Sequence, residues 1–159
     1  FEDQNIERNF IESLLDAIGS KGTIFAHSAS TEKSTLQRLL KKDNLKDLSD
    51  KITKLIDRVV DTKKIVRENF YSPLMNGSSS IKEVVKAIPG DIVYNKDDSM
   101  AGGADAMLAW FLYTDPKTSK EEKNELKKNL IEYCSKDTLA IYHLIKYLLD
   151  QKNINKKGA

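Results

Sequence analysis

The sequence predicts a mostly helical α/β fold that contains two short parallel strands. Apolar residues recur three and four positions apart over most of the chain, which is typical of amphipathic helices. Two short runs, residues 23–27 and 59–61, are rich in β-branched residues and are typical of buried strands. Helical patterns separate these runs, and a helical crossover joins strands that are parallel.

Local patterns predict the elements in chain order. A helix is expected over residues 6–18, ended by Gly19 and Gly22, and Ser30 is expected to cap the helix that follows the first strand. The remaining predicted elements are a short helix over 48–56, a helix over 62–70, a loop over 71–80, a short helix over 81–88, an irregular stretch over 91–103 and a helix over 104–113. A last helix is expected to be capped by Thr118 or Ser119, to bend near Cys134 and to end near Leu149.

The organisation expected from these elements is one domain over residues 1–150 and a basic tail without fixed structure over residues 151–159. Two strands alone do not make a stable sheet. Further strands are therefore expected from outside this chain or from a second copy of it. In the second case the chain would self-associate through its exposed sheet edge.

Composition excludes several classes of protein. The chain has 159 residues, of which 40% are hydrophobic and 31% charged, as in globular proteins. No apolar run approaches the ~20 residues that cross a bilayer, and the single cysteine, Cys134, excludes an internal disulfide. These features predict a cytoplasmic protein with no membrane partner. The net charge of +2 gives no argument for nucleic acid, and the lysine clusters at 117–128 and 152–157 are typical of solvated helix faces.

Tyr133 and Asp137 are the first candidates for chemistry, because four residues of helix place both side chains on one face. A tyrosine hydroxyl beside a metal-binding aspartate can orient an attacking water. The spacing alone has little weight, since Tyr94 and Asp98 share it. Without further context, Tyr133 is read as a half-buried helix residue and Asp137 as a surface acid.

The wider sequence resembles the DEDD exonucleases. Residues 133–140 (YCSKDTLA) are similar to their third acidic segment, in the subgroup with a tyrosine four positions before the final aspartate. Residues 23–32 (TIFAHSASTE) are similar to the second segment, in which a strand ends, a polar turn follows and an acid opens a helix. Residues 76–82 (NGSSSIK) and 102–104 (GGA) add similarity to a bacterial family of domains of unknown function with a predicted DEDD nuclease core.

The resemblance implies a ribonuclease-H-like fold and a metal-dependent 3′–5′ exonuclease that hydrolyses phosphodiesters of nucleic acid, with a single strand as the expected partner. It implies two Mg²⁺ or Mn²⁺ ions, with Glu32 and Asp137 as ligands and Tyr133 orienting the water. His27 and Asp61 are expected at the periphery of this site. By two-metal geometry, the carboxylates of Glu32 and Asp137 are expected roughly 4–8 Å apart.

The chain departs from that pattern in four places. No strand bearing Asp-x-Glu, the first acidic segment, precedes Ile6. We therefore expect the C-terminal two-thirds of such a domain, lacking its first strands, active only in the intact protein and inactive as this fragment. Ser28 replaces the usual asparagine, Thr31 replaces an aromatic residue, and Glu32 stands where many relatives have aspartate.

Each of these candidate residues also has an interpretation that is structural and involves no chemistry. Glu32 is also explained as an acid favoured by the helix dipole, Asp61 as a helix cap, and His27 as a packing residue. Cys134 is expected to be buried, and Trp110 and Phe111 are expected in the core. The alternative function is a non-catalytic, helical protein-interaction domain that inherited the fold, favoured by the changes in the second segment. A third is a helical nucleic-acid-binding module that uses the lysine clusters.

Overall fold

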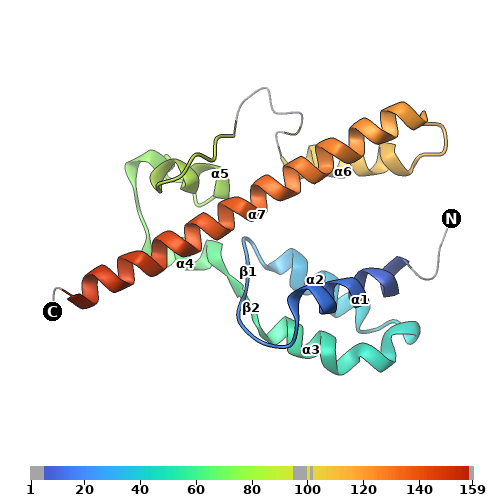
Figure 1. Ribbon diagram of the computed structural model, residues 1–159, viewed down its shortest axis with the longest axis horizontal. Helices are drawn as coiled ribbons and strands as arrows, with labels where there is room; N and C mark the ends of the chain where they lie inside the picture. Colours follow the sequence, from blue (N-terminus) through green and yellow to red (C-terminus); the bar gives the residue numbers. More distant parts are fainter. Residues whose placement is uncertain (1–5, 95–99, 101, 158–159) are drawn as a thin grey trace. The chain divides into compact units, whose positions relative to one another are not determined.

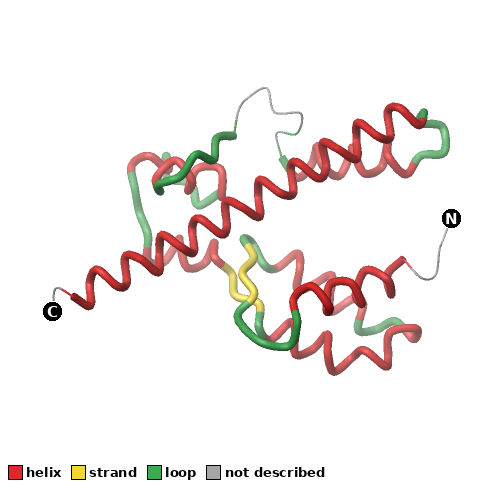
Figure 2. The backbone as a smooth tube through the Cα atoms, in the orientation of Figure 1, coloured by secondary structure: helices red, strands yellow, loops and turns green. Residues whose placement is uncertain are grey.

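The computed structural model describes residues 6–94, 100 and 102–157. These residues form two compact units, which divide between Tyr71 and Ser72. Helices make up most of both units, and the strands of the described residues lie in the first unit (Figure 2). Among the described helices, none is both long and apolar enough to cross a membrane.

The first unit alternates helices with the two short strands (Figure 1). Its elements are α1 (Ile6–Ile18), β1 (Ile24–Ala26), α2 (Ser30–Leu39), the 3₁₀ helix η1 (Asp43–Leu48), α3 (Ser49–Asp57), β2 (Val59–Asp61) and α4 (Thr62–Asn69). The strands pair in parallel, with Ile24 opposite Val59 and Ala26 opposite Asp61. The predicted parallel pairing is confirmed, and with it the α/β class; the two strands are the whole sheet within the described residues.

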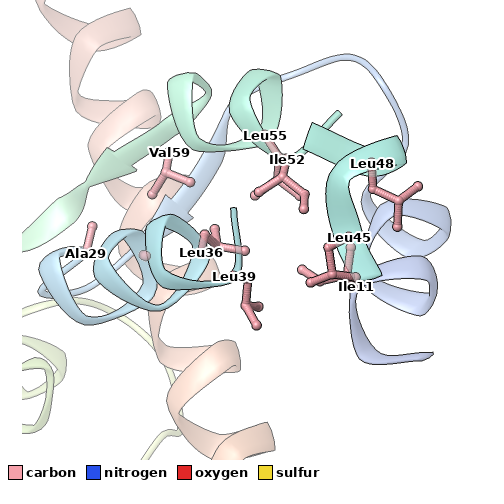
Figure 3. Close-up of a cluster of buried hydrophobic side chains, with 10 residues drawn as sticks. Ile11, Ala29, Leu36, Leu39, Leu45, Leu48, Ile52, Leu55 and Val59 are labelled. Atoms are coloured by element: carbon pink, nitrogen blue, oxygen red, sulfur yellow. The ribbon is translucent and has the colours of Figure 1, made fainter. Parts of the chain in front are cut away.

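One hydrophobic cluster joins the helices of the first unit to its sheet (Figure 3). Ile11 of α1, Leu45 of η1 and Ile52 of α3 have no exposed surface. Each such side chain stabilises the fold by about 1.5–3 kcal/mol relative to an exposed one. The predicted inner face of α1 is only partly buried, because Ile6 and Phe10 at its start are 59% and 51% exposed.

Two arginines fix the loops of the first unit from outside its core. The Arg58 guanidinium donates to the backbone carbonyls of Gly19, Lys21 and Gly22, and so holds the turn between α1 and β1. The Arg8 guanidinium of α1 donates two hydrogen bonds to the Asp47 carboxylate, one to each oxygen, at 2.9 and 2.7 Å. Planar guanidinium groups suit such multiple contacts.

The second unit is built around one long helix. Its elements are η2 (Pro73–Met75), α5 (Ile81–Val84), η3 (Val85–Ala87), α6 (Gly103–Thr114) and α7 (Lys120–Lys157). In Figure 1, α6 runs alongside the first part of α7, and α5 contacts α7 further along. The Ser119 hydroxyl accepts from the Glu122 amide while the Glu122 carboxylate accepts from Ser119, which is a capping box at the start of α7.

Three local expectations differ from the structure. Ser30 does not cap α2: the helix begins at Ser30, Ala29 occupies the cap position, and no side chain accepts a bond there. The last helix is continuous through Cys134 and extends to Lys157, into the segment for which the sequence predicts a tail. Trp110 and Phe111 were expected in the core but are 54% and 62% exposed, because α6 is apolar on more than the face that meets α7.

Candidate functional site

Glu32 lies where the sequence places it, in the first turn of α2 and just beyond the end of β1. Its side chain is exposed. The dipole of α2 favours an acid at this position whether or not it has a chemical role. The predicted strand, polar turn and acid-bearing helix are therefore all present, and they leave both interpretations of Glu32 open.

Asp61 organises the turn that precedes α2. One of its carboxylate oxygens accepts from the Ser28 amide at 3.1 Å and the other from the Ala29 amide at 3.2 Å. The first oxygen also accepts from Lys63 at 2.9 Å and Lys64 at 3.4 Å, which makes Asp61 the cap of α4. Asp61 thus ties the end of β1 to the start of α4 at the end of the sheet.

The charge of Asp61 is stabilised by these bonds. Burial alone would raise the pKa of this carboxyl group, but the amides of Ser28, Lys63, Lys64 and Ala29 together outweigh burial and hold the pKa below its usual value. The helix-cap interpretation of Asp61 is therefore confirmed, whereas a role at the periphery of a catalytic site stays a prediction.

His27 follows β1 and contacts Thr62, which is fully buried at the start of α4. The Thr62 hydroxyl donates to the Ala26 carbonyl at 3.1 Å and lies 2.9 Å from His27 Nδ1. Because the hydroxyl has one proton and gives it to the carbonyl, Nδ1 of His27 must be the donor in the second contact. The hydrogen bond to Thr62 therefore orients the His27 ring, at the same end of the sheet as Asp61.

Tyr133 and Asp137 lie one turn apart on α7 and are both half-buried. A second tyrosine joins them: the Tyr94 hydroxyl donates to Oδ1 of Asp137 at 2.7 Å. The sequence pattern pairs Tyr94 only with Asp98, which lies outside the described residues. Spacing along the chain gives no sign of the contact with Asp137, since the loop that presents Tyr94 lies far from α7 in sequence.

Two lysines complete this cluster, which we call the α7 cluster: Tyr94, Tyr133, Asp137, Lys82 and Lys136. The Lys82 ammonium lies 5.1 Å from the centre of the Tyr94 ring and 5.7 Å from that of Tyr133. The Lys136 ammonium lies 5.6 Å from the Tyr94 ring. Cation–π contacts of this length are attractive by about 0.5–1 kcal/mol when exposed. They place positive charge beside the rings of both tyrosines.

Tyr133 has a strongly shifted ionisation. Burial, followed by the hydrogen bond and negative charge of Asp137, raises the pKa of Tyr133 to about 12. At neutral pH the side chain is a phenol that can donate a hydrogen bond. A phenolate base is excluded under those conditions.

Glu32, His27 and Asp61 belong to the first unit, and Tyr133 and Asp137 to the second. The structure brings Tyr133 and Asp137 together, as predicted, and places His27 and Asp61 at one end of the sheet. The expected approach of Glu32 to Asp137 stays a prediction. Cys134 was expected to be buried and is exposed on α7, so that expectation was wrong.

A two-ion site needs several ligands in one place. Within the described residues, no group of three or more histidine, cysteine, aspartate or glutamate side chains is placed to hold a metal ion. Mg²⁺ and Mn²⁺ prefer several oxygen ligands. Glu32 and Asp137 therefore do not fit a two-ion centre unless other ligands join them.

Comparison with known proteins gives one relationship. Residues 2–80 match the model of a family described as Domain of unknown function (DUF2779). The matched region contains Glu32, His27 and Asp61, and it ends before Tyr133 and Asp137. This match supports the resemblance to a family of domains of unknown function. No curated protein and no solved structure gave a significant match.

Proposed function

We propose that this chain contributes to a nuclease of the DEDD class, which removes nucleotides from the 3′ end of a single-stranded nucleic acid by hydrolysis of phosphodiesters. The observation on which the proposal depends is the α7 cluster, in which a phenol, a carboxylate and two ammonium groups lie together. The strand, turn and Glu32 of the second segment support it, as does the match of residues 2–80 to a family of the kind that the sequence resemblance suggests.

In this proposal the side chains of the α7 cluster act by hydrogen bonding and charge. Tyr133, one turn from Asp137, keeps its hydroxyl proton in the hydrogen bond to that carboxylate and orients the attacking water by accepting a hydrogen bond from it. Asp137 accepts a hydrogen bond and fixes the direction of the neighbouring hydroxyl groups. Lys82 and Lys136 offset negative charge that develops on the phosphate, which is the general requirement for catalysing this reaction.

The proposal includes dependence on Mg²⁺ or Mn²⁺, as the resemblance implies. Because Glu32 and Asp137 are too few to hold two ions, the proposal requires further oxygen ligands besides them. Activity is therefore to be measured on the natural protein that contains this sequence, with each metal added in turn.

An exposed apolar surface favours the second candidate, a protein-interaction domain without catalysis. Five neighbouring side chains of α6 are each at least 44% exposed, namely Met107, Leu108, Trp110, Phe111 and Leu112. Monomeric proteins rarely expose apolar residues in such a continuous set, and aromatic side chains are common at the centres of interfaces. On this view the α7 cluster only fixes the loop that presents Tyr94.

One experiment separates the two candidates. Single-stranded DNA and RNA labelled at the 5′ end are incubated with the natural protein and Mn²⁺ or Mg²⁺, and the products are sized. We expect a ladder shortened from the 3′ end, lost with Asp137→Asn and reduced on the order of a hundredfold or more with Tyr133→Phe. The control Asp150→Asn changes an exposed acid of the same helix and is expected to leave cleavage unchanged. Absence of cleavage with both metals on both substrates would refute the nuclease and leave the interaction domain.

A further inference from the structure

The first unit contains a pocket that the proposed chemistry does not use. Its volume is about 470 Å³, and it lies beside the start of α2 and along α4. Every residue that lines it is polar or charged: Ser28, Ser30, Asp61, Lys63, Lys64, Arg67 and Glu68. Pockets for drug-like organic molecules are lined mainly by apolar and aromatic side chains. This lining instead indicates a small, charged and hydrated ligand group.

The charges of the lining favour an anion. Three of its side chains are cationic and two are acidic. The Asp61 carboxylate already accepts four backbone N–H groups, which offset its charge. Glu68 lies 4.0 Å from the Lys64 ammonium, and both side chains are mostly exposed, so that pair is weak.

Two cations remain available. Within the described residues, the side chains of Lys63 and Arg67 form no ion pair and no hydrogen bond. They are four positions apart on α4, so they project from one face of that helix. The Ser30 hydroxyl lines the same pocket, where its one hydrogen bond, to the Ser28 carbonyl, is long at 3.5 Å. It can therefore turn to an incoming oxygen at little cost.

We propose that this pocket binds a phosphate group of a single-stranded nucleic acid. Lys63 and Arg67 supply the charged contacts, and Ser30 donates a hydrogen bond. Lysine, arginine and serine are the side chains that proteins use to hold the phosphate backbone, and such contacts set the register of a strand without reading its bases. Ser30 begins α2 two residues before Glu32, so the bound phosphate would lie beside the segment that bears the predicted site acid. The proposal rests on the proposed function, since it names a contact for that substrate.

The test measures binding by the 159-residue chain in EDTA, so that no metal-dependent cleavage interferes. Fluorescence anisotropy of a labelled oligothymidylate and a labelled oligouridylate is followed over a range of salt concentrations. Lys63→Gln with Arg67→Gln removes the two charges, and Lys63→Arg with Arg67→Lys exchanges them. The matched control, Lys41→Gln with Lys54→Gln, removes two exposed charges elsewhere in the first unit.

We expect the glutamine pair at 63 and 67 to weaken binding roughly fivefold, as the loss of two ion pairs at a solvent-accessible site would. Each phosphate that is neutralised on a single strand contributes roughly 0.7 to the slope of the logarithm of affinity against that of salt, so loss of this one phosphate contact should lower the slope by about 0.7. The charge-exchanged pair should bind within about twofold of wild type, because the interactions are ionic. The control pair should change neither quantity.

Two results would overturn the proposal: no detectable binding by the wild-type chain, or equal losses in the control and the glutamine pair at 63 and 67. The outcome is independent of catalysis. If the natural protein fails to cleave but the slope falls as expected, the nuclease is refuted and the phosphate site stands. If the natural protein cleaves but the slope is unchanged, the phosphate site is refuted and the nuclease stands.

Discussion

The Tyr94 hydroxyl donates a 2.7 Å hydrogen bond to the Asp137 carboxylate, although the two residues are 43 positions apart in the chain. Tyr94 precedes the start of α6, and Asp137 lies in the middle of α7. The bond therefore joins the segment that follows η3 to the middle of α7. One carboxylate oxygen of Asp137 thus has a hydrogen-bond donor, Tyr94, that the sequence pattern does not indicate.

Removing this hydrogen bond should lower the free energy of unfolding, and the size of the loss should depend on whether Asp137 is present. Tyr94→Phe is expected to lower the free energy of unfolding by about 0.5–1.5 kcal/mol, the usual worth of such a bond. In an Asp137→Asn background the loss should be smaller, by about half or more of its wild-type value, because the two groups are coupled. Urea denaturation of the four variants measures the coupling, and Tyr71→Phe, at a residue that is 78% exposed, is the control. Additive losses would show that the bond does not form in solution.

The ionisation of Tyr133 gives a prediction in alkaline solution. Its pKa is raised to about 12 by burial and then by Asp137. The folded state therefore holds the phenol proton more tightly than the unfolded chain does, and this contribution to stability is lost as pH rises from about 10 through 12. Phenolate absorbance, with Tyr133→Phe as the difference reference, should show one tyrosine titrating near 12.

Asp137→Asn is the matched change for that titration. It removes the negative charge, so the pKa of Tyr133 should fall toward 10, although burial should keep it above that value. An unchanged titration in Asp137→Asn would place the carboxylate away from Tyr133.

The sequence predicted those parts of the molecule that depend on local pattern. The helix over 6–18 and the strand over 59–61 have the predicted bounds, because the helical spacing of the first and the β-branched residues of the second are local features of the sequence. The parallel pairing followed from the crossover between the strands. Tyr94 and Lys82 were missed, because long-range side-chain contacts leave no period in the sequence. Ser30 was wrongly read as a cap, because the backbone is already helical at Ala29 and Ser30 is the first residue of α2.

Asp61 should act on stability rather than through chemistry of its own. Asp61→Ala removes the acceptor of four backbone N–H groups and is expected to lower the free energy of unfolding by about 2–3 kcal/mol. Asp61→Asn keeps one acceptor oxygen and should cost less.

The pH dependence of the wild type tests the charge on Asp61. The folded pKa is lower than the unfolded one, so the contribution is present above the unfolded pKa and is lost as pH falls through the folded pKa. Denaturation between neutral and acidic pH should therefore show a loss that Asp61→Asn lacks. A loss of equal size in Asp61→Asn would assign it to other carboxylates.

Gly90 should resist replacement for two separate reasons. Its φ of +145° is rare for residues with a side chain, and an added Cβ would lie 3.1 Å from Nδ1 of His143. Gly90→Ala is expected to cost about 1–3 kcal/mol. Gly103→Ala is the matched control, because nothing lies within 4 Å of the added carbon and alanine favours the helix there. Adding His143→Ala should recover only the part of the destabilisation that the crowded ring causes, and thermal melts of the three variants measure it.

Ser28 is one of the positions at which this chain departs from the pattern that it resembles, and the backbone conformation there shows what the change costs. Its φ is +69°, in the left-handed region that favours glycine and asparagine, and the resemblance leads one to expect asparagine at this position. Its amide is held by Asp61 at 3.1 Å, so the turn keeps its shape although serine has a conformational cost of about 1 kcal/mol there. Ser28→Asn and Ser28→Gly should therefore raise the free energy of unfolding by about 0.5–1 kcal/mol, and Ser28→Val should lower it. Serine at position 34, exposed within α2, gives the control: Ser34→Gly should destabilise, since glycine disfavours a helix interior. Denaturation midpoints decide the matter, and a loss of stability in Ser28→Gly would show that the turn is not left-handed in solution.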